Sequence, residues 1–141
     1  DGSPRDLYER PVDRFVVHFM GEASILPATI TAHDGAVATV QVGPVSLLVP
    51  RLDSVTGSAS LAVRPHAVRL SAGPVPADML KGNIRRAVYG GDHMEYDVTL
   101  EGFDESLFVI DAAVASPLSV GAEVGVTLLP TGVALLPGGG R

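Results

Sequence analysis

The sequence predicts a mainly β protein built from two tandem copies of one small barrel. Three observations support this fold class. Hydrophobic residues make up 46% of the chain but aromatic residues only 5%, so the core must consist of Val, Leu, Ile and Ala. The 16 glycines and 11 prolines leave little room for long helices and suit short strands joined by turns. Finally, residues 63–70 and 128–135 carry the same pattern.

The clearest single element is a β-hairpin over residues 80–100. From position 93 onward polar and apolar residues alternate, which is the period of a strand with one wet face and one buried face. The apolar members are Met94, Tyr96, Val98 and Leu100. Residues 84–89 form a β-prone run, and Gly90-Gly91-Asp92 can reverse the chain between the two runs. A lone hairpin cannot bury its apolar face, so this one must belong to a larger sheet.

Further strands are expected on both sides of the hairpin, bounded by turn residues. The expected strands are residues 25–32, 37–42, 45–49, 61–63 and 68–70 before it, and 107–110, 124–128 and 133–136 after it. In the first of these, alternation predicts one buried face. Its members are Leu26, Ala28, Ile30 and Ala32.

The two halves of the chain match at an offset of 65 residues, since Pro65 matches Pro130, Val68 matches Val133 and Leu70 matches Leu135. A tandem duplication of a five-strand unit accounts for this match, and five strands are the number in a small OB-type barrel. Two such barrels hold little core each, so we expect them to pack together or to share strands. The predicted boundaries are 25–72 for the first repeat, 73–79 for a linker, 80–137 for the second repeat and 138–141 for a disordered tail.

Residues 1–24 follow a helical pattern instead. Ser3-Pro4 followed by Asp6 is typical of a capped helix start, and Pro11 interrupts that helix. The apolar residues Val12, Phe15, Val16 and Phe19 then recur at the spacing of one helical stripe. One or two short N-terminal helices are therefore predicted. Two interpretations of the stripe stay open: it packs on the β region that follows, or it packs against a neighbouring domain.

Charge and composition argue against several classes of function. The formal net charge of −6, from 16 acidic and 10 basic residues, disfavours nucleic acid as a partner. Without cysteine, neither disulfides nor thiolate metal sites can form. The longest uncharged runs, residues 35–50 and 124–140, contain prolines and are shorter than the roughly 20 apolar residues of a membrane span. We therefore expect no direct membrane insertion.

Four polar residues are candidates for ligand binding. Arg64 and His66 lie at an expected turn and could bind an anion, although a plain turn is the simpler interpretation. His93 and Glu95 share a strand face and could bind a ligand together, or could simply form a solvated face. The histidines lack the spacing of a local metal site, and no nucleophile and base are arranged for catalysis. The sequence thus predicts neither a metal site nor catalytic residues.

Several motifs resemble one known family. The run Gly2-Ser3-Pro4-x-x-Leu7-Tyr8-x-x-Pro11, followed by Phe15-Val16-x-x-Phe19-Met20-Gly21, resembles the exit from the ATPase domain of ABC-importer ATP-binding subunits. Val17 stands where that family usually has alanine. Residues 63–70, 89–98 and 120–128 are similar to the transport-associated OB (TOBE) domain that follows the ATPase domain in that family. The polyamine, iron(III) and phosphonate importers are the most similar group.

This resemblance implies that the chain is the C-terminal accessory domain of a longer ABC-type ATPase, cytoplasmic and peripheral on the inner membrane. It implies a homodimer, a role in regulation, and permease subunits as partners. ATP and Mg would bind only in the ATPase domain, because this chain has no G-x-x-x-x-G-K-[ST] loop to hold phosphates, and no cofactor is expected here. The residues expected to face that domain are Leu7, Tyr8, Pro11, Phe15, Val16 and Phe19.

Two alternatives of a different class remain at this stage. One is a sensor for a small molecule or an oxyanion, bound between the barrels. The other is an OB module for single-stranded nucleic acid, which would require a basic groove with stacking aromatic side chains. Four Phe, three Tyr and the acidic net charge argue against the second.

Overall fold

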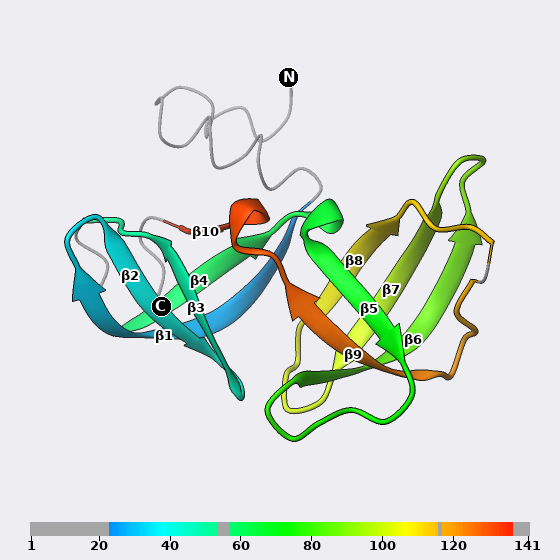
Figure 1. The fold of residues 1–141 in the computed structure, drawn as a ribbon, viewed down its shortest axis with the longest axis horizontal. Helices are drawn as coiled ribbons and strands as arrows, with labels where there is room; N and C mark the ends of the chain where they lie inside the picture. Colours follow the sequence, from blue (N-terminus) through cyan, green and yellow to red (C-terminus); the bar gives the residue numbers. More distant parts are fainter. Residues whose placement is uncertain (1–22, 54–56, 116, 137–141) are drawn as a thin grey trace.

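The computed structural model describes residues 23–53, 57–115 and 117–136, which form two antiparallel five-stranded sheets (Figure 1). The strands are β1 (Ser24–Asp34), β2 (Val37–Val42), β3 (Val45–Pro50), β4 (Ser58–Val63), β5 (Val68–Ala72), β6 (Leu80–Tyr89), β7 (Met94–Leu100), β8 (Ser106–Asp111), β9 (Glu123–Leu128) and β10 (Val133–Leu135). The 3-10 turns η2 (Pro65–Ala67) and η3 (Pro130–Gly132) precede β5 and β10. The mainly β prediction is therefore confirmed.

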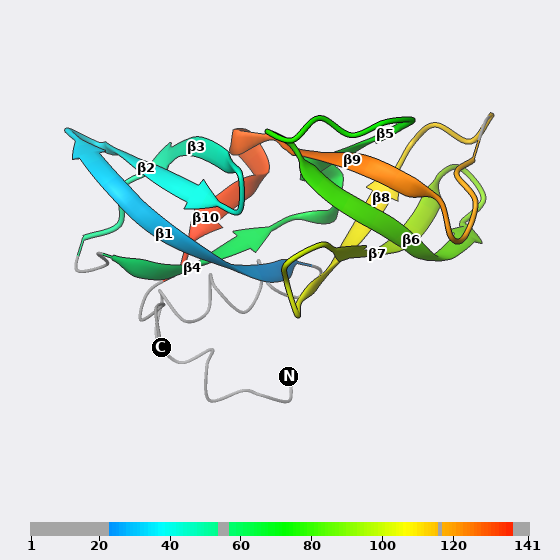
Figure 2. The same cartoon turned by 90° about the horizontal axis from the view of Figure 1, so that it is seen from below.

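The two sheets have the same plan and exchange one strand each. The strand order is β10-β4-β1-β2-β3 in the first sheet and β5-β9-β6-β7-β8 in the second. Strands β1 to β5 correspond in order to β6 to β10, so each sheet takes four strands from one half of the chain and the fifth from the other half. Figure 2 shows β10 returning to the lobe of β1–β4, while β5 lies in the lobe of β6–β9. Each sheet curls, and β3 approaches β10 on the open side of the first one.

The exchange takes place where the two 3-10 turns meet. The backbone N–H of Arg64 donates to the carbonyl of Gly132 at 2.9 Å, and the N–H of Leu129 donates to the carbonyl of Ala67 at 2.7 Å. These two bonds are equivalent, because Arg64 corresponds to Leu129 and Ala67 to Gly132 at the 65-residue offset. The contact is also tight: a Cβ placed on Gly132 would lie 2.2 Å from the Cβ of Ala67. Only glycine fits there without movement.

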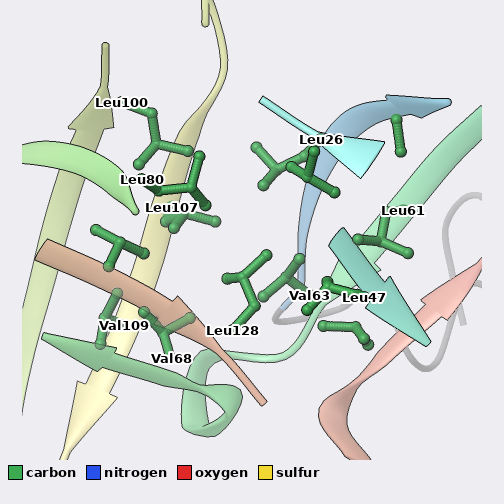
Figure 3. Close-up of a cluster of buried hydrophobic side chains, with 14 of the residues drawn as sticks. Leu26, Leu47, Leu61, Val63, Val68, Leu80, Leu100, Leu107, Val109 and Leu128 are labelled. Carbon is green, nitrogen blue, oxygen red and sulfur yellow. The ribbon is translucent and has the colours of Figure 1, made fainter. Parts of the chain in front are cut away.

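One hydrophobic core runs through both sheets. Figure 3 shows buried leucines and valines from both lobes, with Val63 of β4 and Leu128 of β9 between them. The predicted alternation in β7 is confirmed, since all four apolar residues are buried and the polar ones between them are partly exposed. Tyr96 is 1% exposed, and its hydroxyl accepts a hydrogen bond from the N–H of Leu118 at 2.9 Å. That bond satisfies the polar atom of the largest buried side chain.

The predicted alternation in the first strand fails at one residue. Leu26 and Ala28 are buried and Ile30 is partly buried, but Ala32 is exposed. The register between β1 and β2 shifts between Ile30 and Ala32, which marks a β-bulge and reverses the face of the following residues. The equivalent shift occurs in β6, between Ile84 and Arg86. Both copies of the unit therefore bend at the same place.

The helices predicted in residues 1–24 and the tail predicted at 138–141 fall almost entirely outside the described residues. Only Ala23 and Ser24 of the first segment are described, and Ser24 begins β1. Within the described ranges, no helix is long and apolar enough to span a membrane.

The contact between Gly132 of η3 and Ala67 of η2 can be tested for its contribution to stability by exchanging the two side chains. Gly132→Ala should destabilise the fold by about 1–3 kcal/mol, because the new methyl group overlaps that of Ala67. Adding Ala67→Gly should recover a large part of that loss, so the two effects should not be additive. Urea denaturation of the three variants measures this coupling. Thr131→Ala, at an exposed neighbouring position, is the control and should change stability by less than about 0.5 kcal/mol.

Candidate functional site

The first candidate site is at the tip of the β6–β7 hairpin, where the structure brings His93 and Glu95 into direct contact. Strand β6 is paired with β9 only as far as Asn83, whereas β7 stays paired with β8 as far as Met94, so β6 is the free edge near the tip. The turn is closed by a hydrogen bond of 2.8 Å from the N–H of Gly90 to the carbonyl of His93. The His93 ring lies so close over Gly90 that a Cβ there would be 2.4 Å from Nε2. The absence of a side chain at Gly90 therefore leaves the space that the His93 imidazole occupies.

Both nitrogens of the His93 imidazole face carboxylates. Nε2 lies 2.9 Å from Oε2 of Glu95, and Nδ1 lies 2.6 Å from Oδ1 of Asp92. The hydrogen bond to Glu95, and after it the one to Asp92, raises the pKa of His93 above its ordinary value near 6.5. The same hydrogen bond to His93 lowers the pKa of Asp92. A metal ligand needs a neutral imidazole nitrogen, so this arrangement suits a charged clasp between carboxylates better than a ligand set.

The second candidate pair, Arg64 and His66, lies at the crossover between the sheets. Arg64 precedes η2 and His66 is its middle residue; both are exposed. The carbonyl of His66 accepts a hydrogen bond of 3.3 Å from Nη1 of Arg69, which places a second arginine beside the turn. The structure thus places this pair on a turn between β4 and β5, and the His93 pair on a different hairpin. Sequence reasoning did not pick out Asp92 or Arg69, although both are within three residues of a candidate.

A groove of about 890 Å³ lies between the lobes, where the sensor interpretation expects a ligand, but the residues that line it were not predicted. One wall consists of β1 and β4 of the first sheet, and the other is the loop between β7 and β8 of the second. In that loop Glu101 and Glu105 flank Phe103. Lys81 of β6 forms an ion pair with Glu101 of this loop at 3.7 Å and another with Glu123 of β9 at 3.4 Å. The groove can admit a small molecule, but no described residue carries a catalytic arrangement in it.

Among residues 23–53, 57–115 and 117–136, no three His, Cys, Asp or Glu side chains are grouped to hold a metal ion. The residues predicted to face an ATPase domain lie outside the described part of the chain. They are Leu7, Tyr8, Pro11, Phe15, Val16 and Phe19. Their role therefore stays a prediction.

The fold defines the class of protein: a tandem, strand-exchanged domain of OB-like half-barrels. The cytoplasmic molybdate-binding protein ModG, in a crystal form with molybdate bound, has a similar fold, with a TM-score of 0.57 over 79% of this chain and 94% of ModG at 21% identity. A model of the TOBE domain family matches residues 61–136, which is more than half of the chain. The chain belongs to the TOBE domain family.

Its relatives extend the similarity beyond the matched domain. The Fe(3+) ions import ATP-binding protein FbpC of Brucella abortus (strain 2308) is 35% identical over 135 residues, 96% of this chain. FbpC 1 of Rhizobium meliloti (strain 1021) is 38% identical over 139 residues. The spermidine/putrescine import ATP-binding protein PotA of Ruegeria pomeroyi is 36% identical over 110 residues, 77% of the chain. The chain spans 37% and 38% of the two FbpC proteins and 29% of PotA.

The clasp at the hairpin tip predicts a specific order of effects on the pKa of His93. Glu95→Gln should lower that pKa more than Asp92→Asn does, because the bond to Glu95 is the larger cause of the rise. NMR titration of the imidazole measures both shifts. Because the folded pKa is raised, the stabilisation from the clasp is complete below the unfolded value and is lost as pH rises through the folded one. His93→Gln should remove this component of the pH dependence; an unchanged profile would contradict the clasp.

Proposed function

We propose that this chain is the C-terminal accessory domain of an ATP-binding subunit that energises solute uptake through an ABC importer. The observation that carries the proposal is similarity over 96–98% of the chain to FbpC proteins, which are named as import ATP-binding proteins. The solutes named for the relatives, Fe(3+) ions and spermidine or putrescine, make iron(III) and polyamines the first candidates for transport. Phosphonate is a further candidate from the sequence motifs.

In this proposal the domain contributes no catalysis of its own. Its parent chain would bind ATP and Mg in an ATPase domain that precedes it, with Leu7, Tyr8 and Pro11 near the junction. The domain would help two subunits form a homodimer, regulate transport, and lie in the cytoplasm at the inner membrane through the permease subunits. A shared core through both lobes supports such a role, because a rigid double unit presents fixed surfaces to its neighbours.

Deleting the domain from the complete protein tests the proposal. The reading frame that encodes Asp1 should also encode a phosphate-binding loop upstream, and its product should hydrolyse ATP. Removing residues 23–136 should leave the nucleotide site intact but weaken subunit association by at least about tenfold, as measured by sedimentation, since dimer contacts would be lost. The control is His33→Ala in the complete protein, which changes one exposed side chain. A reading frame without the loop, or an equally strong dimer after deletion, would contradict the proposal.

The alternative of a sensor domain is tested by calorimetry on the same chain. ModG binds molybdate and has a similar fold, so molybdate is the oxyanion to titrate, with spermidine and Fe(3+) citrate as further ligands. The accessory role alone predicts no saturable heat with any of them. Saturable binding of molybdate that is lost in Arg64→Ser but kept in Arg51→Ser would instead favour an oxyanion site at η2. Arg51 is the control because it lies in another loop, next to Asp53.

A further inference from the structure

Strands β1, β2 and β3 of the first lobe (Figure 1) carry almost no charge, although the chain as a whole is acidic. Residues 23–50, which contain these strands, include a single charged residue, Asp34, at the end of β1. Residues 80–111, which contain the equivalent strands β6, β7 and β8, include ten charged residues, and seven of these are acidic. The two copies of the unit thus share a strand plan but differ in charge.

The outer face of these three strands, opposite the core, is neutral and accessible. Its members are paired in two rows across the sheet, with Thr29, Gln41 and Ser46 in one row and Ala32, Thr39 and Leu48 in the other. Directly paired residues have their side chains on the same face, and the residues between them, such as Val40 and Leu47, belong to the core. We call the six paired residues the neutral face. Leu48, on the strand farthest from β4, is 61% exposed.

The second sheet contains the same two rows, and one of them carries an ion pair. The register places Asn83, Thr99 and Ser106 in one row and Arg86, Asp97 and Phe108 in the other. Nη1 of Arg86 lies 3.4 Å from Oδ2 of Asp97. The fold therefore accepts charge at these positions, and the lack of charge on the neutral face is a property of the first copy.

Two polar side chains of the neutral face are hydrogen-bonded locally. Oγ of Ser46 donates to Oε1 of Gln41 at 2.7 Å, and Nε2 of Gln41 donates to the carbonyl of Gly43 at 2.8 Å. A polar group that keeps its hydrogen bond loses little when water is removed from it. Another surface can therefore cover these side chains at a small cost of desolvation.

A second copy of the chain is the partner that this distribution of charge favours. In a two-fold symmetric dimer the same surface lies on both sides of the interface, so a charge near the axis faces a like charge. The net charge of −6 makes two copies repel each other on average. The neutral face meets itself without this repulsion, and charged residues are depleted from the cores of protein interfaces in general.

We propose that two copies of this chain associate through the neutral face, with Leu48 of each copy near the two-fold axis. The proposal rests on the homodimer of the proposed function and names the surface that joins the two domains. Three strands form a face about 10 Å wide and about 20 Å long, which is smaller than the roughly 800 Å² per partner of a standard interface. The contact by itself therefore gives a weak dimer, which a second contact between the parent subunits strengthens by raising the effective concentration.

A charge placed in the neutral face should separate the two copies. The 141-residue chain should show a concentration-dependent dimer in sedimentation equilibrium. Leu48→Glu should raise the dissociation constant by at least about tenfold, because two carboxylates then face each other, and high salt should recover part of that loss. Ser46→Glu should act in the same direction. The control is Ser106→Glu, the same substitution at the equivalent place of the second sheet, which should change the constant less than about twofold.

A thiol in the neutral face tests the contact between copies directly. The chain has no cysteine, so Leu48→Cys contains a single thiol. A disulfide between two copies requires their Cα atoms to lie within about 7 Å of each other. Mild oxidation should therefore produce disulfide-linked dimers of Leu48→Cys at least about tenfold faster than those of Ser106→Cys, which form only by random collision.

Three results would each overturn the proposal: a chain that sediments as a monomer up to about 1 mM, association that is unchanged in Leu48→Glu, or equal oxidation rates for the two thiol variants. The first would leave the neutral face to a different partner. Failure of the proposed function has a separate sign, which is an equally strong dimer after deletion of residues 23–136 from the complete protein. A dimer weakened by that deletion but not by Leu48→Glu would contradict the neutral face alone.

Discussion

The exchange of fifth strands at the contact between η2 and η3 is the constraint on which the structure depends. Two backbone hydrogen bonds, from Arg64 to Gly132 and from Leu129 to Ala67, hold the crossing chains together. Because the turns touch at a glycine, the strands that follow can pass each other and enter opposite sheets. Neither sheet has five strands without this crossing, and the exchanged strands contribute Val68 of β5 and Val133 of β10 to the core that runs between the lobes.

The local sequence pattern predicted where the strands lie, but not which strands pair with one another. All ten expected strands exist, because alternation and turn residues act over a few positions, as in β7. The sharing of strands was expected, but which strand moves could not be read: residues 68–70 and 133–135 present the same apolar pattern to either sheet. Ala32 was placed on the wrong face because a bulge at Ile30 depends on pairing with β2. Residues 1–22, which carry the most specific motifs, lie outside the described structure.

Part of each candidate site could likewise be predicted from the sequence, and part could not. That His93 and Glu95 share a face follows from strand period, and the structure adds Asp92 through the geometry of the turn. The residues that line the groove between the lobes could not be predicted, because the loop with Glu101 comes next to β1 only in the tertiary fold. Membership of the TOBE family, in contrast, was expected from motifs such as residues 63–70 and is confirmed. Motifs at fixed spacing can be recognised in the sequence, whereas contacts between distant segments produce no local pattern.

The reciprocal crossover also determines how many units the molecule needs. A single unit would leave its own sheet one strand short, at the place that β10 fills, and would carry one strand, β5, that its own sheet does not use. Two separate units could exchange their fifth strands only by associating, at a rate set by their concentration. Two units on one polypeptide do so within a single molecule at any dilution. In this chain the exchange is therefore intramolecular and does not depend on protein concentration.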